Sequence, residues 1–251
     1  MPTVSLFIPC LVDLVLPRVG ECTATLLSHL GCKPIYHSEQ TCCGLMAFNG
    51  GHRDEARRLA RRFIRVFEHD PLIVSPSGSC VHMVKQRYAE LFADEPAWRA
   101  RALALAPRVY ELSQFVVDFL GVQDVGAADE VTVAYHESCS TLNALGVSAQ
   151  PKALIRAVRG ATLKEWQGAD VCCGFGGTFA NSFAPISSAL VRQKVAFFLE
   201  SGADLLVMCD PGCLLNIGGY LHRHHPDKQA MHLAQFLADR LPDGPARDAW
   251  S

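Results

Sequence analysis

Cys172-Cys173-Gly174-Phe175-Gly176-Gly177 is the most informative stretch of this chain, because a second Cys-Cys-Gly occurs at residues 42–44. Adjacent trans residues hold their Cα atoms about 3.8 Å apart, which is closer than ordinary disulfide geometry allows. We therefore expect neither pair to form a disulfide with itself. Paired thiolates can instead bind different iron atoms of one compact cluster, and a following glycine lets the backbone approach inorganic sulfide. The stretch predicts an iron–sulfur site.

The two parts of the chain repeat one order of segments around these motifs. Each has an apolar run that ends near a cysteine, a helical spacing, the Cys-Cys-Gly turn, an amphipathic helix, a second apolar run and another cysteine. In the first copy these are residues 4–8, Cys10, 17–30, 42–44, 53–69, 72–75 and Cys80. In the second copy they are residues 131–135, Cys139, 151–158, 172–174, 186–201, 205–208 and Cys213. The chain is therefore predicted to be a tandem duplication.

An alternation of strands and helices predicts an α/β fold with mainly parallel sheets, in two tandem halves related by a pseudo-twofold axis. Segments 112–118 and 233–239 also resemble each other. Residues 121–130 are the expected joint, giving a first half of 1–125 and a second of 126–251, or one compact unit of both. Ligands of parallel sheets gather at the carboxyl ends of the strands, where each half has its cysteines. Residues 244–251 are expected to fray.

The composition is that of a soluble globular protein. Of 251 residues, 49% are hydrophobic and 19% charged, and the net charge of −2 gives no signature for nucleic acid. Asp13 and Pro17 interrupt the longest early apolar run, and the first residues lack a basic signal-peptide region. We expect a cytoplasmic protein without a membrane span, in which the eleven cysteines are not disulfide-bonded.

Four cysteines in each half match the four thiolates that a 4Fe-4S cluster requires. The predicted ligands are Cys10, Cys42, Cys43 and Cys80 in the first half, and Cys139, Cys172, Cys173 and Cys213 in the second. The ligands of a bacterial ferredoxin lie closer together, and a zinc ribbon has two C-x2-C knuckles that are missing here. One or two clusters are expected, and a four-thiolate zinc site in each half is the open alternative.

The three cysteines outside the predicted ligand sets, and the glycines of the second Cys-Cys-Gly motif, can each have a purely structural role. Cys22 and Cys32 have no counterpart in the second half and are expected to be inert buried thiols. Cys209 aligns with Pro76 and is left out of the predicted ligands, although its spacing from Cys213 could let it substitute for that ligand. The second motif has three glycines that can form a nest of N–H groups toward a cofactor, or only a tight turn: Gly174, Gly176 and Gly177.

Several histidines and arginines can likewise have either a functional or a structural role. His136 can hydrogen-bond to a cluster sulfur or cap the following turn. Three histidines at 222, 224 and 225 indicate an exposed helix end more than a metal site. Six arginines within residues 53–69 indicate a solvated helix face or, less simply, a surface for an acidic partner.

The repeated spacing C-x31-CCG-x36-C and C-x32-CCG-x39-C resembles the CCG (cysteine-rich) domain family. That family includes the cysteine-rich subunit of heterodisulfide reductase, the iron–sulfur subunits of glycolate oxidase and anaerobic glycerol-3-phosphate dehydrogenase, and proteins of lactate utilisation, which are the most similar. The blocks that match are residues 40–44, 77–80, 135–139, 172–179, 212–214 and 231–234, within a span of 4–239. The resemblance implies a cytoplasmic electron-transfer subunit with 4Fe-4S clusters, whose partners are other subunits of a complex oxidising L-lactate to pyruvate.

The chain departs from the resemblance at Met83 and Asn216, which stand where the heterodisulfide reductase member of the family has a further cysteine. This favours electron transfer by ordinary clusters over thiol–disulfide chemistry. Thiol–disulfide reduction is the alternative, together with a role in oxidising glycolate or glycerol 3-phosphate.

Overall fold

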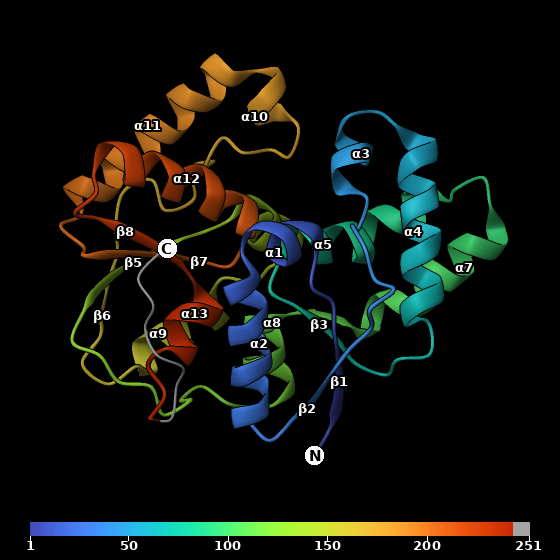
Figure 1. Ribbon diagram of the computed structural model, residues 1–251, viewed down its shortest axis with the longest axis horizontal. Coiled ribbons are helices and arrows are strands. Elements are labelled where there is room, and N and C mark those ends of the chain that lie inside the picture. The colour runs from blue at the N-terminus through green and yellow to red at the C-terminus, as the bar shows by residue number, and fades with distance from the viewer. Residues whose placement is uncertain (243–251) are drawn as a thin grey trace.

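The computed structural model describes residues 1–242, which form two four-stranded parallel sheets (Figure 1). The first sheet has the order β2-β1-β3-β4, with β1 (Thr3–Leu6), β2 (Lys33–Tyr36), β3 (Ile73–Ser75) and β4 (Val109–Glu111). The second has the order β6-β5-β7-β8, with β5 (Thr132–His136), β6 (Thr162–Lys164), β7 (Leu205–Met208) and β8 (Gln229–His232). The predicted α/β fold of two similar parallel halves is confirmed. The expected fraying of residues 244–251 lies outside the described residues.

The central strands are apolar because both faces of each sheet are covered. All residues of β3 and β7 are buried, as are the last three of β1. β5 pairs with β7 from Val133 opposite Leu205 to His136 opposite Met208, so both strands end at the same edge. The next residues after these ends carry the cysteines toward one region, as expected for a parallel sheet.

The first half contains the helices that the spacing predicted and several that it did not. Residues 17–30 form α2 (Pro17–His29), and residues 53–69 form α4 (Arg53–Phe67). The remaining helical segments are α1 (Cys10–Val15), α3 (Leu45–Asn49), α5 (Gly78–His82), η1 (Met83–Arg87), α6 (Tyr88–Leu91), α7 (Pro96–Leu105), η2 (Ala106–Arg108), α8 (Leu112–Gln114) and η3 (Phe115–Phe119).

The arginines of α4 line its outer side. The inner side buries Ala56, Ala60, Phe63, Ile64 and Phe67. Outside, the guanidinium groups pair with acidic groups of this same half, such as Arg57 with Asp94 at 2.6 Å. Four of the six arginines are exposed, as expected for a solvated helix face, whereas Arg57 and Arg61 are half-buried.

The second half repeats the pattern with fewer helices. The predicted helix at residues 151–158 lies within α9 (Ala149–Ala157) apart from residue 158. The predicted helix at residues 186–201 lies within α11 (Ala184–Glu200) apart from residue 201. The others are η4 (Ser140–Ala144), α10 (Phe179–Ser182), α12 (Pro211–His224) and α13 (Leu233–Ala238). Among residues 1–242, no helix is long and apolar enough to cross a membrane.

The two halves exchange contacts reciprocally. In Figure 1, α2 of the first half lies beside α13 of the second, and α9 of the second half likewise contacts α8 and η3 of the first. Gly78 lies so close to Thr141 that a Cβ on the glycine would be 2.0 Å from the threonine hydroxyl. The Asp210 carboxylate accepts a hydrogen bond from the Ser79 backbone N–H at 3.0 Å. This reciprocity is what a pseudo-twofold axis produces.

Candidate metal centre

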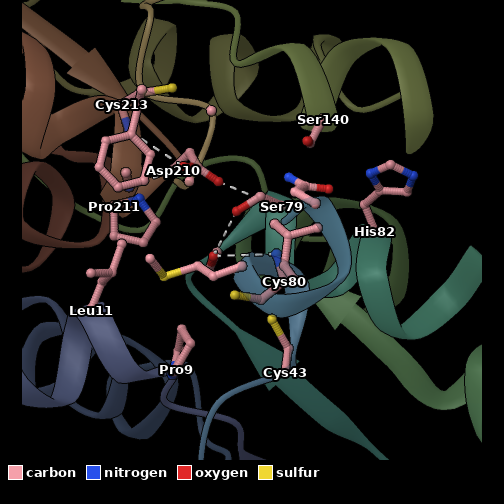
Figure 2. A pocket seen from close by; sticks show the side chains of 18 of the residues that line it. Pro9, Leu11, Cys43, Ser79, Cys80, His82, Ser140, Asp210, Pro211 and Cys213 are labelled. Atoms are coloured by element: carbon pink, nitrogen blue, oxygen red, sulfur yellow. Dashed lines mark hydrogen bonds between the residues drawn. The ribbon is translucent and has the colours of Figure 1, made fainter. Parts of the chain in front are cut away.

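All eight predicted ligand cysteines border one cavity of about 230 Å³ between the two halves. In Figure 2, Cys43 and Cys80 lie together on one side of this cavity, and Cys213 lies on the other. Apolar side chains, including Leu11, complete much of the wall. Two sets of thiols that are distant in sequence therefore converge on a shared space.

The four thiols of the first half come from three segments at the carboxyl edge of the sheet. Cys10 begins α1 shortly after β1, the adjacent pair precedes α3, and Cys80 lies in α5 after β3. The Cys42 sulfur interacts with those of Cys10 and Cys43, and Cys43 interacts in turn with Cys80. The four sulfurs thus form one continuous chain of contacts.

The second half repeats this chain of sulfurs. Cys139 lies directly before η4, Cys172 and Cys173 precede α10, and Cys213 lies in the first turn of α12. The Cys173 and Cys213 sulfurs are 2.9 Å apart. Since all eleven cysteines are free thiols, the prediction that neither adjacent pair forms a disulfide is confirmed.

The first cysteine of each pair is electrostatically suited to be a thiolate. Hydrogen bonds from Cys10 and then Cys43 hold the pKa of Cys42 well below its usual range, and the Gly44 N–H adds a third donor at 3.3 Å. Cys139 and Cys173 lower the pKa of Cys172 in the same way. Thiolate is the form that binds a metal.

Glycine follows each pair because the backbone is left-handed there. Gly44 has φ 86° and Gly174 has φ 85°, a region that other residues rarely adopt. A Cβ on Gly174 would also lie 2.8 Å from the Ser187 carbonyl oxygen in α11. Gly176 and Gly177 border the cavity, and Gly177 lies against Met46 of the first half. A cofactor-binding role for the three glycines stays a prediction.

Each half fixes the carbonyl of its second paired cysteine with a different donor. The Tyr88 hydroxyl donates to the Cys43 carbonyl at 2.9 Å, whereas the Asn216 amide donates to the Cys173 carbonyl at 2.7 Å. Asn216, which stands where the heterodisulfide reductase member of the family has a further cysteine, therefore supports the loop of Cys173. Its counterpart in the first half, Met83, is fully buried in the apolar core. Local sequence gives no signal for these two donors, because only the tertiary structure brings them to the turn.

A buried lysine supports the second set of thiols. The Lys194 ammonium donates to the carbonyl oxygens of Gly168 at 2.5 Å, Ala169 at 2.9 Å and Val171 at 2.8 Å, just before Cys172. Burial lowers the pKa of Lys194 to about 8, although the nearby thiols oppose this shift. Lys194 was not among the predicted site residues, but a lysine on the apolar side of a predicted helix was the available signal.

His136 lies at the end of β5 with almost no solvent exposure. A ring nitrogen of His136 and the sulfurs of Cys173 and Cys213 all lie within 4.8 Å of one another. Its Nδ1 is 3.2 Å from the Ala169 carbonyl oxygen, and its Nε2 is buried without a hydrogen-bond partner among the described residues. Burial, and then the Lys194 charge, lower the pKa of His136 to about 3. The His136 side chain therefore lies beside two of the thiols, and its hydrogen-bond contact is to Ala169 and not to the turn that follows it.

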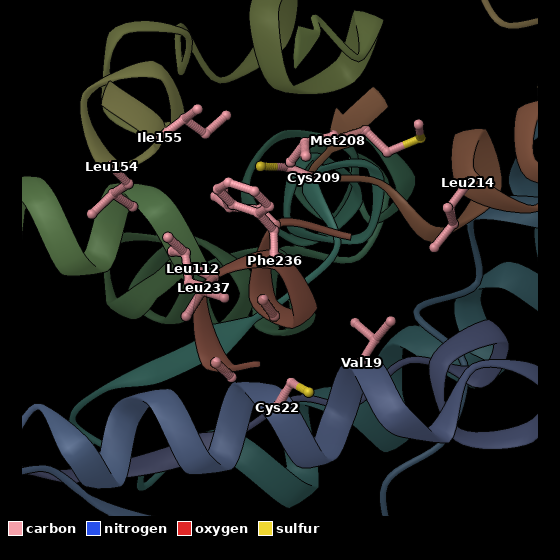
Figure 3. Close-up of a cluster of buried hydrophobic side chains, with 14 of the residues drawn as sticks. Val19, Cys22, Leu112, Leu154, Ile155, Met208, Cys209, Leu214, Phe236 and Leu237 are labelled. Atoms are coloured by element: carbon pink, nitrogen blue, oxygen red, sulfur yellow. The ribbon is translucent and has the colours of Figure 1, made fainter. Parts of the chain in front are cut away.

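The other cysteines lie away from the cavity lining, as expected for inert thiols. Cys22 and Cys209 lie among buried side chains such as Leu112 and Phe236 (Figure 3). Cys32 is also buried. The end of α12 is largely exposed, with His222 and His224 on the surface, which confirms the interpretation of an exposed helix end.

These residues fit a metal or cluster site. Each half supplies four sulfur donors in contact, a thiolate stabilised by a backbone N–H, and a loop held by a side-chain hydrogen bond to the carbonyl of its second paired cysteine. The buried Nε2 of His136 has no partner among the described residues. Thiolate-rich sets of this kind select iron–sulfur clusters, zinc or copper(I) among biological metals.

Comparison with known proteins gives one family. A family model described as "Cysteine-rich domain" (CCG) matches residues 4–85 and 133–218, which contain the two sets of cysteines. The chain is 45% identical over 240 residues to Lactate utilization protein A of Exiguobacterium sp., covering 94% of this chain and 97% of that protein. It is 43% identical over 237 residues to Lactate utilization protein A of Bacillus subtilis, covering 94% and 99%.

A solved structure shares the fold. The crystal structure of a hypothetical protein from Helicobacter pylori superimposes with a TM-score of 0.64 at 12% identity. The match covers 97% of this chain and 49% of that chain. At this identity the likeness concerns the fold alone.

Proposed function

This chain belongs to the cysteine-rich (CCG) domain family, and we propose that it is an iron–sulfur electron-transfer subunit of a multi-protein complex that oxidises L-lactate to pyruvate. The observation that carries the proposal is the convergence of two four-thiol sets on one cavity. The lactate part rests on the names of the relatives. We propose that the protein carries out this role in the cytoplasm.

The eight cysteines would hold one 4Fe-4S cluster in each half. Cys42 and Cys172 act as preformed thiolates, and the other six thiols lose protons when metal binds. A bound cluster stores and releases single electrons. The backbone N–H groups of Gly44 and Gly174 donate to the sulfurs of Cys42 and Cys172, and these hydrogen bonds would stabilise the more negative, reduced form of a bound cluster.

Lactate is proposed to react on a partner subunit. The cavity is lined mainly by thiols and apolar groups, and the sequence has no dinucleotide or flavin fingerprint. This chain would then receive electrons and pass them on, with the clusters of its two halves as successive electron carriers.

Thiol–disulfide reduction is a second candidate, because the cavity lies between both sets of thiols and has room for a small molecule. On this hypothesis, purified protein supplied with dithionite reduces a small organic disulfide without partner proteins. Failure to do so, with clusters intact, would leave electron transfer as the function.

Anaerobic purification tests the cofactor. We expect brown protein with iron and acid-labile sulfide in equal amounts and an electron paramagnetic resonance (EPR) signal after reduction by dithionite. Colourless protein with stoichiometric zinc and no sulfide would overturn the proposal.

Complementation tests the substrate. In a bacterium lacking its own lactate utilization protein A, expression of this chain should restore growth on L-lactate, and Cys173→Ser should not. Rescue of growth on glycolate or glycerol 3-phosphate, in strains lacking the corresponding subunits, but not on lactate would reassign the substrate.

A further inference from the structure

Among residues 1–242, only one group of three histidine, cysteine or acidic side chains has its donor atoms within 4.8 Å of one another: His136, Cys173 and Cys213. Two of these are proposed cluster ligands and the third is an imidazole. Each of the three is buried. The imidazole therefore lies beside the deeper thiols of the second set and away from solvent.

The contacts of His136 define which ring nitrogen is available. Nδ1 lies 3.2 Å from the Ala169 carbonyl oxygen, and a carbonyl only accepts, so Nδ1 carries the proton. The Lys194 ammonium donates to that same oxygen at 2.9 Å. With Nδ1 engaged by this carbonyl, Nε2 is the ring nitrogen left for another partner.

Nε2 is then an acceptor that nothing in the described part of the chain satisfies. Buried polar atoms without partners are costly and rare in native proteins. Histidines that bind metals commonly donate their other N–H to a backbone carbonyl, which fixes the ring, and Nδ1 of His136 makes such a contact.

We propose that Nε2 of His136 is a metal ligand of the second half, in addition to its four cysteines. The proposal rests on the proposed function, since it assumes iron bound by these cysteines. The second site then offers five donor atoms of two kinds, whereas the first offers four thiolates.

The first half cannot reproduce this arrangement. Phe7 precedes Cys10 by three residues, as His136 precedes Cys139, and Phe7 packs edge-on against Phe63 with ring centres 4.7 Å apart. Gly44 meets Leu59 as Gly174 meets Leu190, which aligns Phe63 with Lys194 four residues further along each helix. A pair of phenyl rings therefore occupies the place of the histidine and the lysine.

The test is EPR with nitrogen hyperfine spectroscopy on anaerobically purified, dithionite-reduced protein in which histidine is labelled with ¹⁵N. We expect a strong coupling of the size given by directly bound imidazole. It should disappear in His136→Cys, in which the new thiolate keeps iron and sulfide in place. His82→Gln is the control, because His82 borders the cavity from the first half, and it should keep the coupling.

The outcomes separate this inference from the proposed function. Iron and sulfide with only the weak coupling of a hydrogen-bonded N–H, or with a coupling unchanged in His136→Cys, would overturn the inference and leave the electron-transfer proposal standing. Zinc without sulfide would overturn both. If His136→Cys does not fold, labelled wild type and His82→Gln decide the question, because absence of a strong coupling from both overturns the inference.

Discussion

The two halves present the same four thiols on different supports. Behind the first set lie Phe7 and Phe63, and behind the second lie His136 and Lys194. The loops that carry the cysteines are alike in both copies, while the layer beneath them is apolar in one and polar in the other. If each half holds the proposed cluster, the two clusters should differ in reduction potential, because charge and hydrogen bonding near a cluster set its potential.

The largest effect is expected from removing a thiol from either set. Cys173→Ser should lose about half of the iron and visible absorption together with electron transfer, and Cys43→Ser should lose the other half. Iron analysis and EPR on each variant measure this. Cys22→Ser is the control, because that thiol lies outside the cavity lining. A full cluster signal in Cys173→Ser would remove Cys173 from the ligands.

Lys194→Met should make the two halves more alike. Three carbonyls lose their donor, at about 1 kcal/mol each, so the free energy of unfolding should fall by about 3 kcal/mol. Loss of the positive charge should also lower the reduction potential of the second site only. Redox titration followed by EPR measures both sites, with Phe63→Leu as the matched change in the first half. Equal shifts at both sites would contradict the assigned asymmetry.

A third prediction compares the residues that end the last strand of each sheet, Glu111 and His232. Burial raises the pKa of Glu111 from 4.5 to about 7, so the folded protein keeps a proton that the unfolded chain releases. The free energy of unfolding should therefore fall by about 3 kcal/mol as pH rises from 4.5 to 7. Glu111→Gln should abolish this slope in anaerobic chemical unfolding.

His232 should give the opposite slope. Burial lowers its pKa from 6.5 to about 4, so the unfolded chain gains a proton first as pH falls. Stability contributed by the neutral ring is present above pH 6.5 and is lost as pH falls toward 4. His232→Gln should remove that loss, and identical pH profiles for both variants would refute the comparison.

The smallest effects are expected at the two donors to the paired-cysteine carbonyls. Asn216→Ala and Tyr88→Phe each leave one carbonyl without its donor, which should lower the free energy of unfolding by about 1 kcal/mol. Each should also broaden the EPR signal of its own half only. Broadening of both signals would show that the halves are coupled more tightly than these contacts indicate.

Local sequence was sufficient for the elements with strong periodicity. The strand at residues 205–208 was predicted with its observed bounds, and α4 was predicted to within two residues. The edge strands β2 and β6 were not predicted, because their partly exposed residues have no distinct apolar pattern. Both copies carry their four cysteines at the same edge of their sheets, as the duplication predicted, while the role of these cysteines as metal ligands stays a prediction.

The support of the site depends on contacts between distant segments. Lys194 contacts carbonyls more than twenty residues earlier, and Tyr88 lies 45 residues after Cys43. The close approach of Gly78 to Thr141 joins the two halves. No local pattern encodes such pairs, so a single sequence could name the candidate ligands but could not identify what fixes them.

The packing of α2 against α13 also bears on biosynthesis. Val19, Cys22 and Leu26 near the start of the chain share an apolar cluster with Phe236 and Leu237 near its end. The helix α2 therefore stays partly uncovered until residues 233–238 have left the ribosome. A nascent chain stalled before residue 233 would leave this apolar face of α2 exposed and prone to aggregation.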